Sequence, residues 1–257
     1  MRIMKDIRIL NANVIKIMAA VFMFIDHAGL LLFPGQEWMR CVGRISMPLF
    51  AYLIAEGCRY TRDRTKHFAM IFILGFFCQL VYQLFDGSDI YINILFTFSL
   101  SILMIYALQN FKHSVADGQV KIFGKILSGL MFAVLVAAVY FLNTVTRVNG
   151  KYFTIDYGFW GCMLPVFASL TDFRGINLPE KLKWLDSHFI KLIPFSAGLL
   201  LLCLFTDGIN EWYAFIALAP LLIYNGKKGR FNLKYFFYVF YPAHLALLEG
   251  IFMLINM

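Results

Sequence analysis

The first long apolar stretch of the chain carries two ionisable residues whose spacing could serve chemistry, Lys16 and His27. Eleven residues of an α-helix make about three turns and rise about 16 Å, so both side chains would share one face. That face would hold an ammonium group near one membrane surface and an imidazole beyond the midplane. The pattern predicts a path for a long anionic ligand, whose phosphates meet Lys16 while its reactive end reaches His27 as a general base. The alternative is that Lys16 snorkels at a helix end and His27 is a hydrogen-bonded core residue.

Three further charged residues lie toward the same predicted end, Asp26, Arg40 and Arg44. Asp26 adjoins His27 but is turned about 100° from it on a helix, so the two cannot reach the same point. Arg40 and Arg44 are four residues apart and could share a helix face. There they would hold an anion or polarise a carbonyl oxygen. The alternative for both arginines is anchoring at the membrane interface.

Glu56 and the basic residues after it stand at the other end of the second apolar stretch. Arg59 follows Glu56 by three residues, which predicts an ion pair within one helix. Arg59 belongs to a basic cluster with Arg62, Arg64 and Lys66. The cluster indicates membrane topology first and a site for nucleotide phosphates second.

Polar residues also occur in two later apolar stretches. His244 follows Pro242, which should free a backbone carbonyl group and kink a helix, and Tyr241 shares its face. We expect His244 to be either a site residue or a packing histidine that bonds another helix. Asn93 and Thr97 could line the same cavity or act as hydrogen-bonding groups between helices. Ionisable groups at membrane depth cost about 2.5–3.5 kcal/mol, which makes these few residues the functional candidates.

The composition requires that these residues be held by membrane helices. Of the 257 residues, 61% are hydrophobic and 15% are charged, and 28 are Phe. Soluble domains contain about 45–50% apolar and about 25% charged residues. This excludes an ordinary cytosolic enzyme, a disordered chain and a disulfide scaffold. We expect an all-α, polytopic helical bundle in a lipid bilayer, forming a single domain over residues 1–257.

Apolar stretches long enough to cross a bilayer indicate about nine spans, although two of them are short. Under the assumption of a cytoplasmic N-terminus, all but four of the 23 Lys and Arg residues fall on the cytoplasmic side. This distribution follows the positive-inside rule and places the C-terminus outside. The nine predicted spans run near residues 14–33, 43–60, 67–85, 91–110, 124–145, 157–171, 189–206, 211–226 and 234–256.

Other classes of site and partner find little support in the sequence. The net charge of +8 would suggest nucleic acid for a soluble protein, but here the basic residues flank apolar stretches, so we expect no nucleic-acid partner. The five cysteines show no Cys-x-x-Cys or Cys/His spacing, and we expect no metal site. A Ser/His/Asp triad and a glycine-rich phosphate loop are not evident either. Histidine acting as a general base is the chemistry that the residues favour.

Several of these stretches resemble the TraX family, small polytopic inner-membrane proteins whose founding role is acetylation of the N-terminus of pilin in conjugation. The resemblance covers five apolar stretches in the expected order, whereas residues 111–150 and 172–233 match only as apolar spans and basic loops. The matching segments are IKIMAAVFMFIDHAGLLLFP, RCVGRISMPLFAYLIAEGCRYTRDR, NILFTF, DYGFWGCML and KYFFYVFYPAHLALL.

TraX proteins in turn resemble transmembrane acyltransferases, which use cytosolic acyl-CoA on acceptors outside the cytoplasm. Members of that class carry a basic residue, ten residues and then a histidine on the first span, as do Lys16 and His27. The resemblance implies a multi-pass acetyltransferase of the bacterial cytoplasmic membrane, with acetyl-CoA as co-substrate and a pilin-like peptide or a sugar as acceptor. It further implies a catalytic role for His27 and a coenzyme A contact for Lys16, and it favours Arg44, Glu56, Tyr241 and His244 as site residues. Together with the residue patterns, this gives as expected catalytic residues His27, Asp26, Arg44 and His244, as cofactor contacts Lys16, Arg59, Arg62 and Glu56, and as substrate contacts Arg40, Asn93 and Tyr241.

Two other classes of function fit the same residues. A transporter or flippase-like protein could use His27 as a proton relay along a polar path. A non-enzymatic subunit of a secretion or pilus complex would bind neither acetyl-CoA nor an acceptor. Coenzyme A binding favours the enzyme, and substrate movement without acyl transfer favours the transporter.

Overall fold

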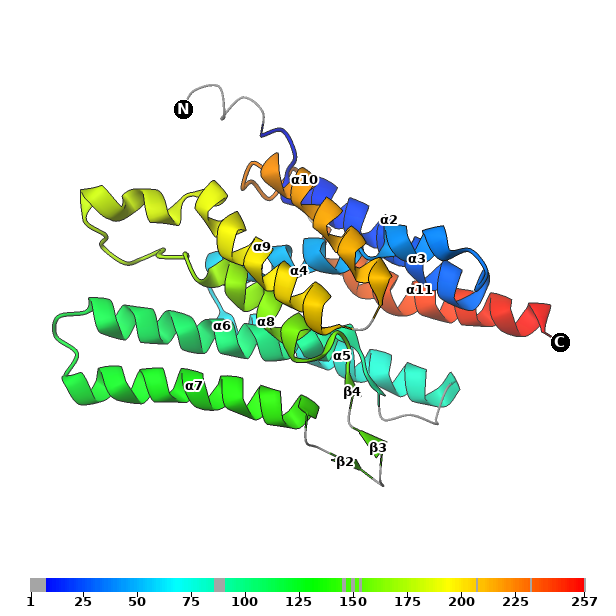
Figure 1. Cartoon of the computed structure of the whole chain (residues 1–257), viewed down its shortest axis with the longest axis horizontal. Helices are drawn as coiled ribbons and strands as arrows, with labels where there is room; N and C mark the ends of the chain where they lie inside the picture. Colours follow the sequence, from blue (N-terminus) through cyan, green and yellow to red (C-terminus); the bar gives the residue numbers. More distant parts are fainter. Residues whose placement is uncertain are drawn as a thin grey trace. The chain divides into compact units, whose positions relative to one another are not determined.

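The computed structural model describes residues 8–85, 91–144, 147–148, 151–152, 154–206, 208–231 and 233–256. These residues form α-helices and two 3₁₀-helices, and the only strands described are two residues long, which confirms the expected all-α class (Figure 1). The elements are α2 (Ala12–Leu31), α3 (Glu37–Gly43), α4 (Ser46–Tyr60), α5 (Arg64–Phe85), β1 (Tyr91–Ile92), α6 (Ile94–Ala116), α7 (Ile122–Thr144), β2 (Arg147–Val148), β3 (Lys151–Tyr152), β4 (Thr154–Ile155), α8 (Gly158–Ser169), η1 (Glu180–Asp186), α9 (His188–Phe205), η2 (Ile209–Ala217), α10 (Leu218–Leu222) and α11 (Lys234–Ile255).

Seven helices among the described residues are long and apolar enough to cross a membrane, so the count of nine is not confirmed. The predicted span near 157–171 corresponds to α8, which has 12 residues and covers about 18 Å at 1.5 Å per residue. Several of its side chains are fully buried, as expected for a short helix inside a protein. The seven candidates are Ala12–Leu31, Glu37–Tyr60, Arg64–Val81, Ile94–Ala116, Ile122–Thr144, His188–Phe205 and Phe236–Ile255.

The predicted span near 211–226 is instead η2 followed directly by α10. A 3₁₀-helix rises about 2.0 Å per residue and has three residues per turn, so every third side chain lies in one column. In η2 this column consists of Glu211, Ala214 and Ala217, all of which are buried. The side chains of Trp212 and Tyr213 are exposed. η2 therefore buries one narrow ridge and presents aromatic rings on its other faces.

The contacts divide the chain into two compact units. Unit 1 comprises Met1–Leu53, Leu80–Gly87 and Leu199–Met257, and unit 2 comprises Ile54–Gln79 and Ser88–Gly198, as far as these residues are described. Both units contain buried polar residues among those described.

In unit 1, α2 packs against α3 and α11, and α3 packs against η2. Two glycines allow α2 and α3 to approach closely: a Cβ at Gly29 would lie 2.7 Å from that of Met39, and one at Gly43 would lie 2.2 Å from Oδ1 of Asp26. The break between α3 and α4 falls at Arg44 and Ile45. Its cause is Pro48, which has no N–H to donate to the carbonyl group four residues earlier.

In unit 2, α6 packs against α7 on one side and α8 on another (Figure 1). α7 is the most hydropathic of the candidate spans, and only 6% of its apolar window is buried. Most of its surface is therefore exposed in this structure, as expected for a helix that faces lipid. Asn93 caps the N-terminus of α6, and its side chain accepts a hydrogen bond from the backbone N–H of Leu95 at 3.0 Å.

Candidate functional site

His27 and His244 form a direct hydrogen bond between α2 and α11 in unit 1. Nδ1 of His27 lies 2.8 Å from Nε2 of His244, and the two rings are inclined by 26°. His244 is only 3% exposed, and the ring of Phe240 stacks on it at 5.1 Å between centroids. We call these two residues the histidine pair.

The partners of the histidine pair assign its protons. Nδ1 of His244 is 3.0 Å from the carbonyl oxygen of Phe240, which can only accept a hydrogen bond. Nδ1 of His244 therefore carries a proton, and when the ring is neutral its Nε2 accepts, which is the state that we assign here. Nδ1 of His27 must donate to that Nε2. This leaves Nε2 of His27 as the ring nitrogen with the lone pair.

Tyr241 lies beside the histidine pair on α11. Its ring meets that of His244 edge-on at 5.5 Å between centroids, and the residue is 9% exposed. The predicted face of α11 is thus occupied by three neighbouring rings, those of Phe240, Tyr241 and His244.

Asp26 lies in a separate ionic cluster between α2, α3 and η2. Arg40 Nη1 is 2.9 Å from Asp26 Oδ2 and donates to the Asp26 backbone oxygen at 3.2 Å. Arg44 Nη1 is 2.8 Å from Glu211 Oε1, and its Nη2 is 4.0 Å from Asp26 Oδ1. The cluster holds two cations and two anions, so its formal charge is balanced. Both arginines are already engaged by carboxylates.

An apolar groove of about 370 Å³ runs between α2 and α11. Ile17, Val21 and Phe236, which are exposed, form part of its wall together with Phe240. Because Phe240 stacks on His244, the groove extends to the ring that covers the histidine pair, although neither histidine lines it. Its wall suits the hydrocarbon part of a ligand and offers no partner to phosphates.

Lys16 lies on the first turns of α2, with Lys228 as its charged neighbour. Ile17 follows Lys16 and lines the groove. The groove therefore runs along α2 beside Lys16, but neither Lys16 nor His27 lines it.

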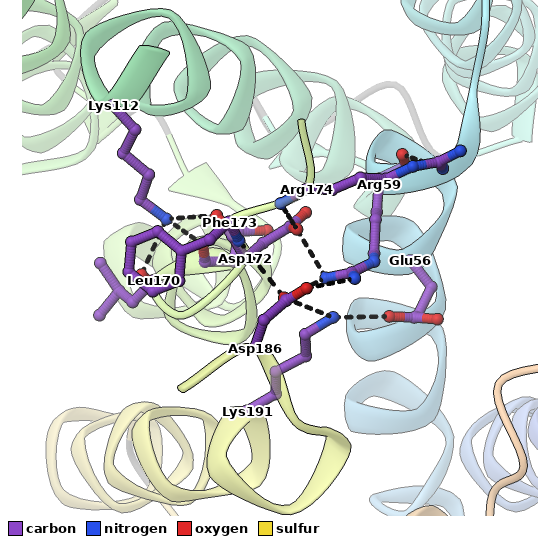
Figure 2. A network of polar contacts seen from close by, with 10 residues as sticks. Glu56, Arg59, Lys112, Leu170, Asp172, Phe173, Arg174, Asp186 and Lys191 are labelled. Carbon is purple, nitrogen blue, oxygen red and sulfur yellow. Dashed lines mark hydrogen bonds and ion pairs between the residues drawn. The ribbon is translucent and has the colours of Figure 1, made fainter. Parts of the chain in front are cut away.

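The second group of polar residues surrounds Arg59 in unit 2 (Figure 2). Arg59 Nη1 is 2.6 Å from Asp172 Oδ1 and 2.6 Å from Asp186 Oδ1, and Nη2 donates to Asp186 Oδ2 at 2.8 Å. Burial raises the pKa of the Asp186 carboxyl, but the hydrogen bonds and the charge of Arg59 outweigh it and lower this pKa below its ordinary value. Arg59 is therefore held by two carboxylates from the segment after α8.

The expected ion pair between Glu56 and Arg59 is wrong. Glu56 Oε1 lies 3.6 Å from Nζ of Lys191 on α9, and Arg59 turns to Asp172 and Asp186 instead (Figure 2). Lys191 is itself 3.9 Å from Asp186 Oδ1. Both cations share the carboxylate of Asp186, which joins them into one network.

Lys112 of α6 holds the end of α8. Its ammonium group donates to the carbonyl oxygens of Ser169, Leu170 and Asp172 at 2.7, 2.8 and 3.0 Å (Figure 2). Carbonyl groups at the C-terminal end of a helix lack partners within it and attract a cation. Lys112 thus uses its three N–H groups to fix the segment that carries Asp172.

Asn93, expected either to contact substrate or to bond helices, has its amide fully engaged in helix contacts. Its Nδ2 donates to the carbonyl oxygen of Gly75 and to Oε1 of Gln79, both at 2.9 Å, and its Oδ1 caps α6. Thr97 donates to the backbone oxygen of Asp156 at 2.9 Å. These contacts tie α5 and β4 to the start of α6.

Sequence reasoning missed the acids that organise both units. Glu211, Asp172 and Asp186 are not among the candidates that the sequence singles out. The sequence offered only a weak signal, because the segment 170–187 carries three acids and three bases without showing which of them pair. Across the described residues, no group of three or more His, Cys, Asp or Glu is placed to hold a metal. All five cysteines are free.

The apolar helices and the polar groups buried between them define a multi-pass membrane protein. The sequence profile of the TraX family, described as "TraX protein", matches residues 11–252. The chain therefore belongs to the TraX family, which confirms the resemblance seen in its motifs.

Individual relatives agree with this membership. The "Probable fimbrial assembly protein FimC, serogroup H1" of Dichelobacter nodosus is 27% identical over 263 residues, which cover 93% of this chain and 94% of that protein. "Uncharacterized protein RP591" of Rickettsia prowazekii (strain Madrid E) is 32% identical over 82 residues, covering 32% of this chain and 33% of that protein. No solved structure matches the chain.

Proposed function

We propose that this protein is a membrane-embedded acetyltransferase of the bacterial cytoplasmic membrane. It moves an acetyl group from cytosolic acetyl-CoA to an amine or hydroxyl group of an acceptor outside the cytoplasm. His27 is the catalytic base, and His244 is a positioning residue that acts through His27.

The observation that carries the proposal is the direction of hydrogen bonding through the histidine pair. The chain of donors runs from His27 Nδ1 to His244 Nε2, and from His244 Nδ1 to the carbonyl oxygen of Phe240. A base needs a lone pair and a fixed ring orientation. Nε2 of His27 has the lone pair, and the hydrogen bond to His244 fixes the orientation of the ring.

The proposed step balances in protons and bonds. Nε2 of His27 takes the proton from the acceptor amine or hydroxyl group as its nitrogen or oxygen attacks the thioester carbonyl carbon. The new bond to the acceptor forms, the C–S bond breaks, and the proton on His27 passes to the departing thiolate of coenzyme A. His244 stabilises the transient imidazolium by accepting from its Nδ1–H. A second route, in which His27 carries the acetyl group as acyl-histidine, uses the same nitrogen.

The predicted cofactor contacts divide between the two units. In unit 1, Lys16 precedes Ile17 of the groove wall and offers an ammonium group to a phosphate of acetyl-CoA. In unit 2, Arg62 is exposed, whereas Arg59 and Glu56 are bound in the ion network. Within unit 1 we therefore assign Lys16 to ligand contact. Within unit 2, taken by itself, Arg62 is the exposed candidate, and we assign Arg59 and Glu56 to support of the surrounding structure.

The ionic cluster of Asp26 receives a different role from the one expected. Arg44 was predicted to stabilise a developing oxyanion, but its guanidinium group is held by Glu211 and Asp26. We propose that Asp26, Arg40 and Arg44 fix α3 against α2 and thereby hold the segment that carries His27.

The name of one relative suggests which class of acceptor to test first. Its relative over nearly the full length bears the name of a fimbrial assembly protein. We therefore propose a pilin-like peptide amine as the acceptor to test first, with a sugar hydroxyl group as the second.

The test uses purified full-length protein with isotopically labelled acetyl-CoA and a short pilin-like peptide. His27→Gln keeps an N–H that can donate to His244 but removes the base, and we expect it to lower kcat by at least about 100-fold. The control is His67→Gln, a histidine that contacts Tyr106 in unit 2. Equal acetyl transfer by wild type and a folded His27→Gln protein would overturn the proposal. Movement of a solute across vesicles without release of coenzyme A would support the transporter instead.

A further inference from the structure

A polar cavity of about 410 Å³ lies in unit 2 and shares Arg59, Lys112 and Asp172 with the ion network, whereas Lys191 does not line it. It is lined by the last residues of α4, by α6 near Gln109, and by the loop after α8. Its volume falls within the range of about 300–1,000 Å³ that is usual for small-molecule sites. Its wall carries five cationic side chains and one carboxylate, that of Asp172: the cations are Arg59, Arg62, Arg64, Lys112 and Arg174.

Three of these cations retain donors for a ligand. Within the part of the chain that the structure describes, Arg62, Arg64 and Arg174 form no ion pair with a carboxylate. Arg64 donates to the side-chain oxygen of Asn110 at 2.6 Å, and Arg174 donates to the backbone oxygen of Arg59 at 2.8 Å. A guanidinium group has five N–H donors, so most of theirs remain available.

The loop that carries Arg174 is held in a fixed shape. The N–H of Ile176 donates to the carbonyl oxygen of Phe173 at 3.0 Å, which closes a turn, and Gly175 has φ +78°. The N–H of Arg174 donates to Oδ1 of Asp172 at 3.1 Å, and its guanidinium carbon lies 4.8 Å from the centre of the Tyr60 ring. Because this loop and Arg59 are already fixed, a ligand would find much of the site preorganised.

We propose that this cavity binds phosphate groups. Several guanidinium groups around a cavity with an excess of positive charge match the planar, bidentate recognition of phosphate oxygens. The phosphates can come from the nucleotide part of acetyl-CoA or from the headgroup of an anionic lipid at the membrane surface. The nucleotide source rests on the proposed function, whereas the phosphate chemistry does not.

The test measures binding of adenosine 3′,5′-bisphosphate to the purified full chain in nanodiscs of neutral lipid. We expect Arg62→Gln and Arg174→Gln each to weaken binding by about tenfold or more, since a hydrogen bond to a charged group is lost. Lys66→Gln is the matched control, because Lys66 belongs to the same basic cluster but does not line the cavity. Arg62 is exposed, so its variant is expected to fold even if the loss of Arg174 disturbs the loop.

The outcomes separate the two sources. Tight binding of the bisphosphate that both variants weaken supports the nucleotide source. Absence of bisphosphate binding, together with binding of short-chain phosphatidylglycerol that both variants weaken, supports the lipid source and excludes the nucleotide. Equal binding of both probes by wild type, Arg62→Gln and Lys66→Gln overturns the proposal.

The same measurement on His27→Gln keeps this proposal apart from the proposed function. Bisphosphate binding should be unchanged in that variant, since His27 belongs to unit 1 and the cavity to unit 2. If His27→Gln still transfers acetyl groups while the cavity variants lose binding, the acetyltransferase mechanism fails and the phosphate site stands.

Discussion

The carboxylate of Asp26 lies directly against the backbone of Gly43, where a Cβ would fall 2.2 Å from Oδ1 and 2.3 Å from the Asp26 Cβ. We expect Gly43→Ala to push α3 away from α2 and to weaken the ion pairs of Asp26. Overpacking of this kind costs about 1–3 kcal/mol, which thermal unfolding of the detergent-solubilised protein would measure. Gly35→Ala is the control, because nothing lies within 4 Å of a Cβ there. Equal melting temperatures for the two variants would show that α3 adjusts without cost.

His244→Gln tests the role of the second histidine in the proposed reaction. The side-chain oxygen of Gln can accept the N–H of His27, whereas Ala leaves that donor unpaired. We expect His244→Ala to lower kcat by about 100-fold with little change in KM, and His244→Gln to restore part of the loss. A merely structural role would instead lower the melting temperature of both variants and leave the kcat of the folded fraction unchanged.

Asp172→Asn probes the ion network of unit 2. Asp172 is buried and lies 2.6 Å from Arg59, so loss of its charge leaves a buried guanidinium group less well paired. Breaking a buried pair costs about 3 kcal/mol, which corresponds to about 6–12 °C in Tm for a chain of this size. Glu180→Gln is the control, because its ion pair with Lys183 is exposed. We expect that variant to change stability by less than about 1 kcal/mol.

Asp186 gives this network a dependence on pH. Its pKa is lowered in the folded chain, mainly by Arg59, so its stabilising effect is complete above the unfolded value of about 3.9 and is lost as pH falls through the folded value. We expect the Tm difference between wild type and Asp186→Asn to stay constant from about pH 7 to pH 5. Below about pH 4 the difference should shrink. A difference that grows on acidification would contradict the pairing with Arg59.

Lys112→Met removes the cation from the end of α8 while keeping most of the side-chain volume. Three carbonyl groups lose their donor, so the segment 169–176 should open more readily. We expect amide hydrogen exchange there to accelerate about tenfold or more, which hydrogen-exchange mass spectrometry would show. Lys121→Met, at an exposed position before α7, should leave exchange in this segment unchanged.

The apolar stretches predicted the long helices because their length and composition are local properties. The same reasoning failed at 157–171 and 211–226, since composition does not reveal that α8 stops after 12 residues or that the next segment is a 3₁₀-helix. A break between α3 and α4 could be anticipated from Pro48, because the missing N–H is a property of one residue.

The candidate site was predictable only where the signal was local. The spacing of Lys16 and His27 indicated one face of one helix, and the structure extends an apolar groove along that helix. The pairing of Glu56 was mistaken, because Arg59 meets partners 113 and 127 residues away in sequence. The local spacing of charges cannot reveal that carboxylates from distant parts of the sequence compete for the same arginine.

Glu211, Ala214 and Ala217 form one buried column on η2, so the rotation of this 3₁₀-helix is fixed by which residues fall in that column. One inserted residue turns a 3₁₀-helix by about 120°, so an insertion after Glu211 would replace the two buried alanines by neighbours with bulkier, exposed side chains. An insertion before Glu211 would instead swing its carboxylate away from Arg44. Within η2 we therefore expect length changes to preserve the buried column only in steps of three residues.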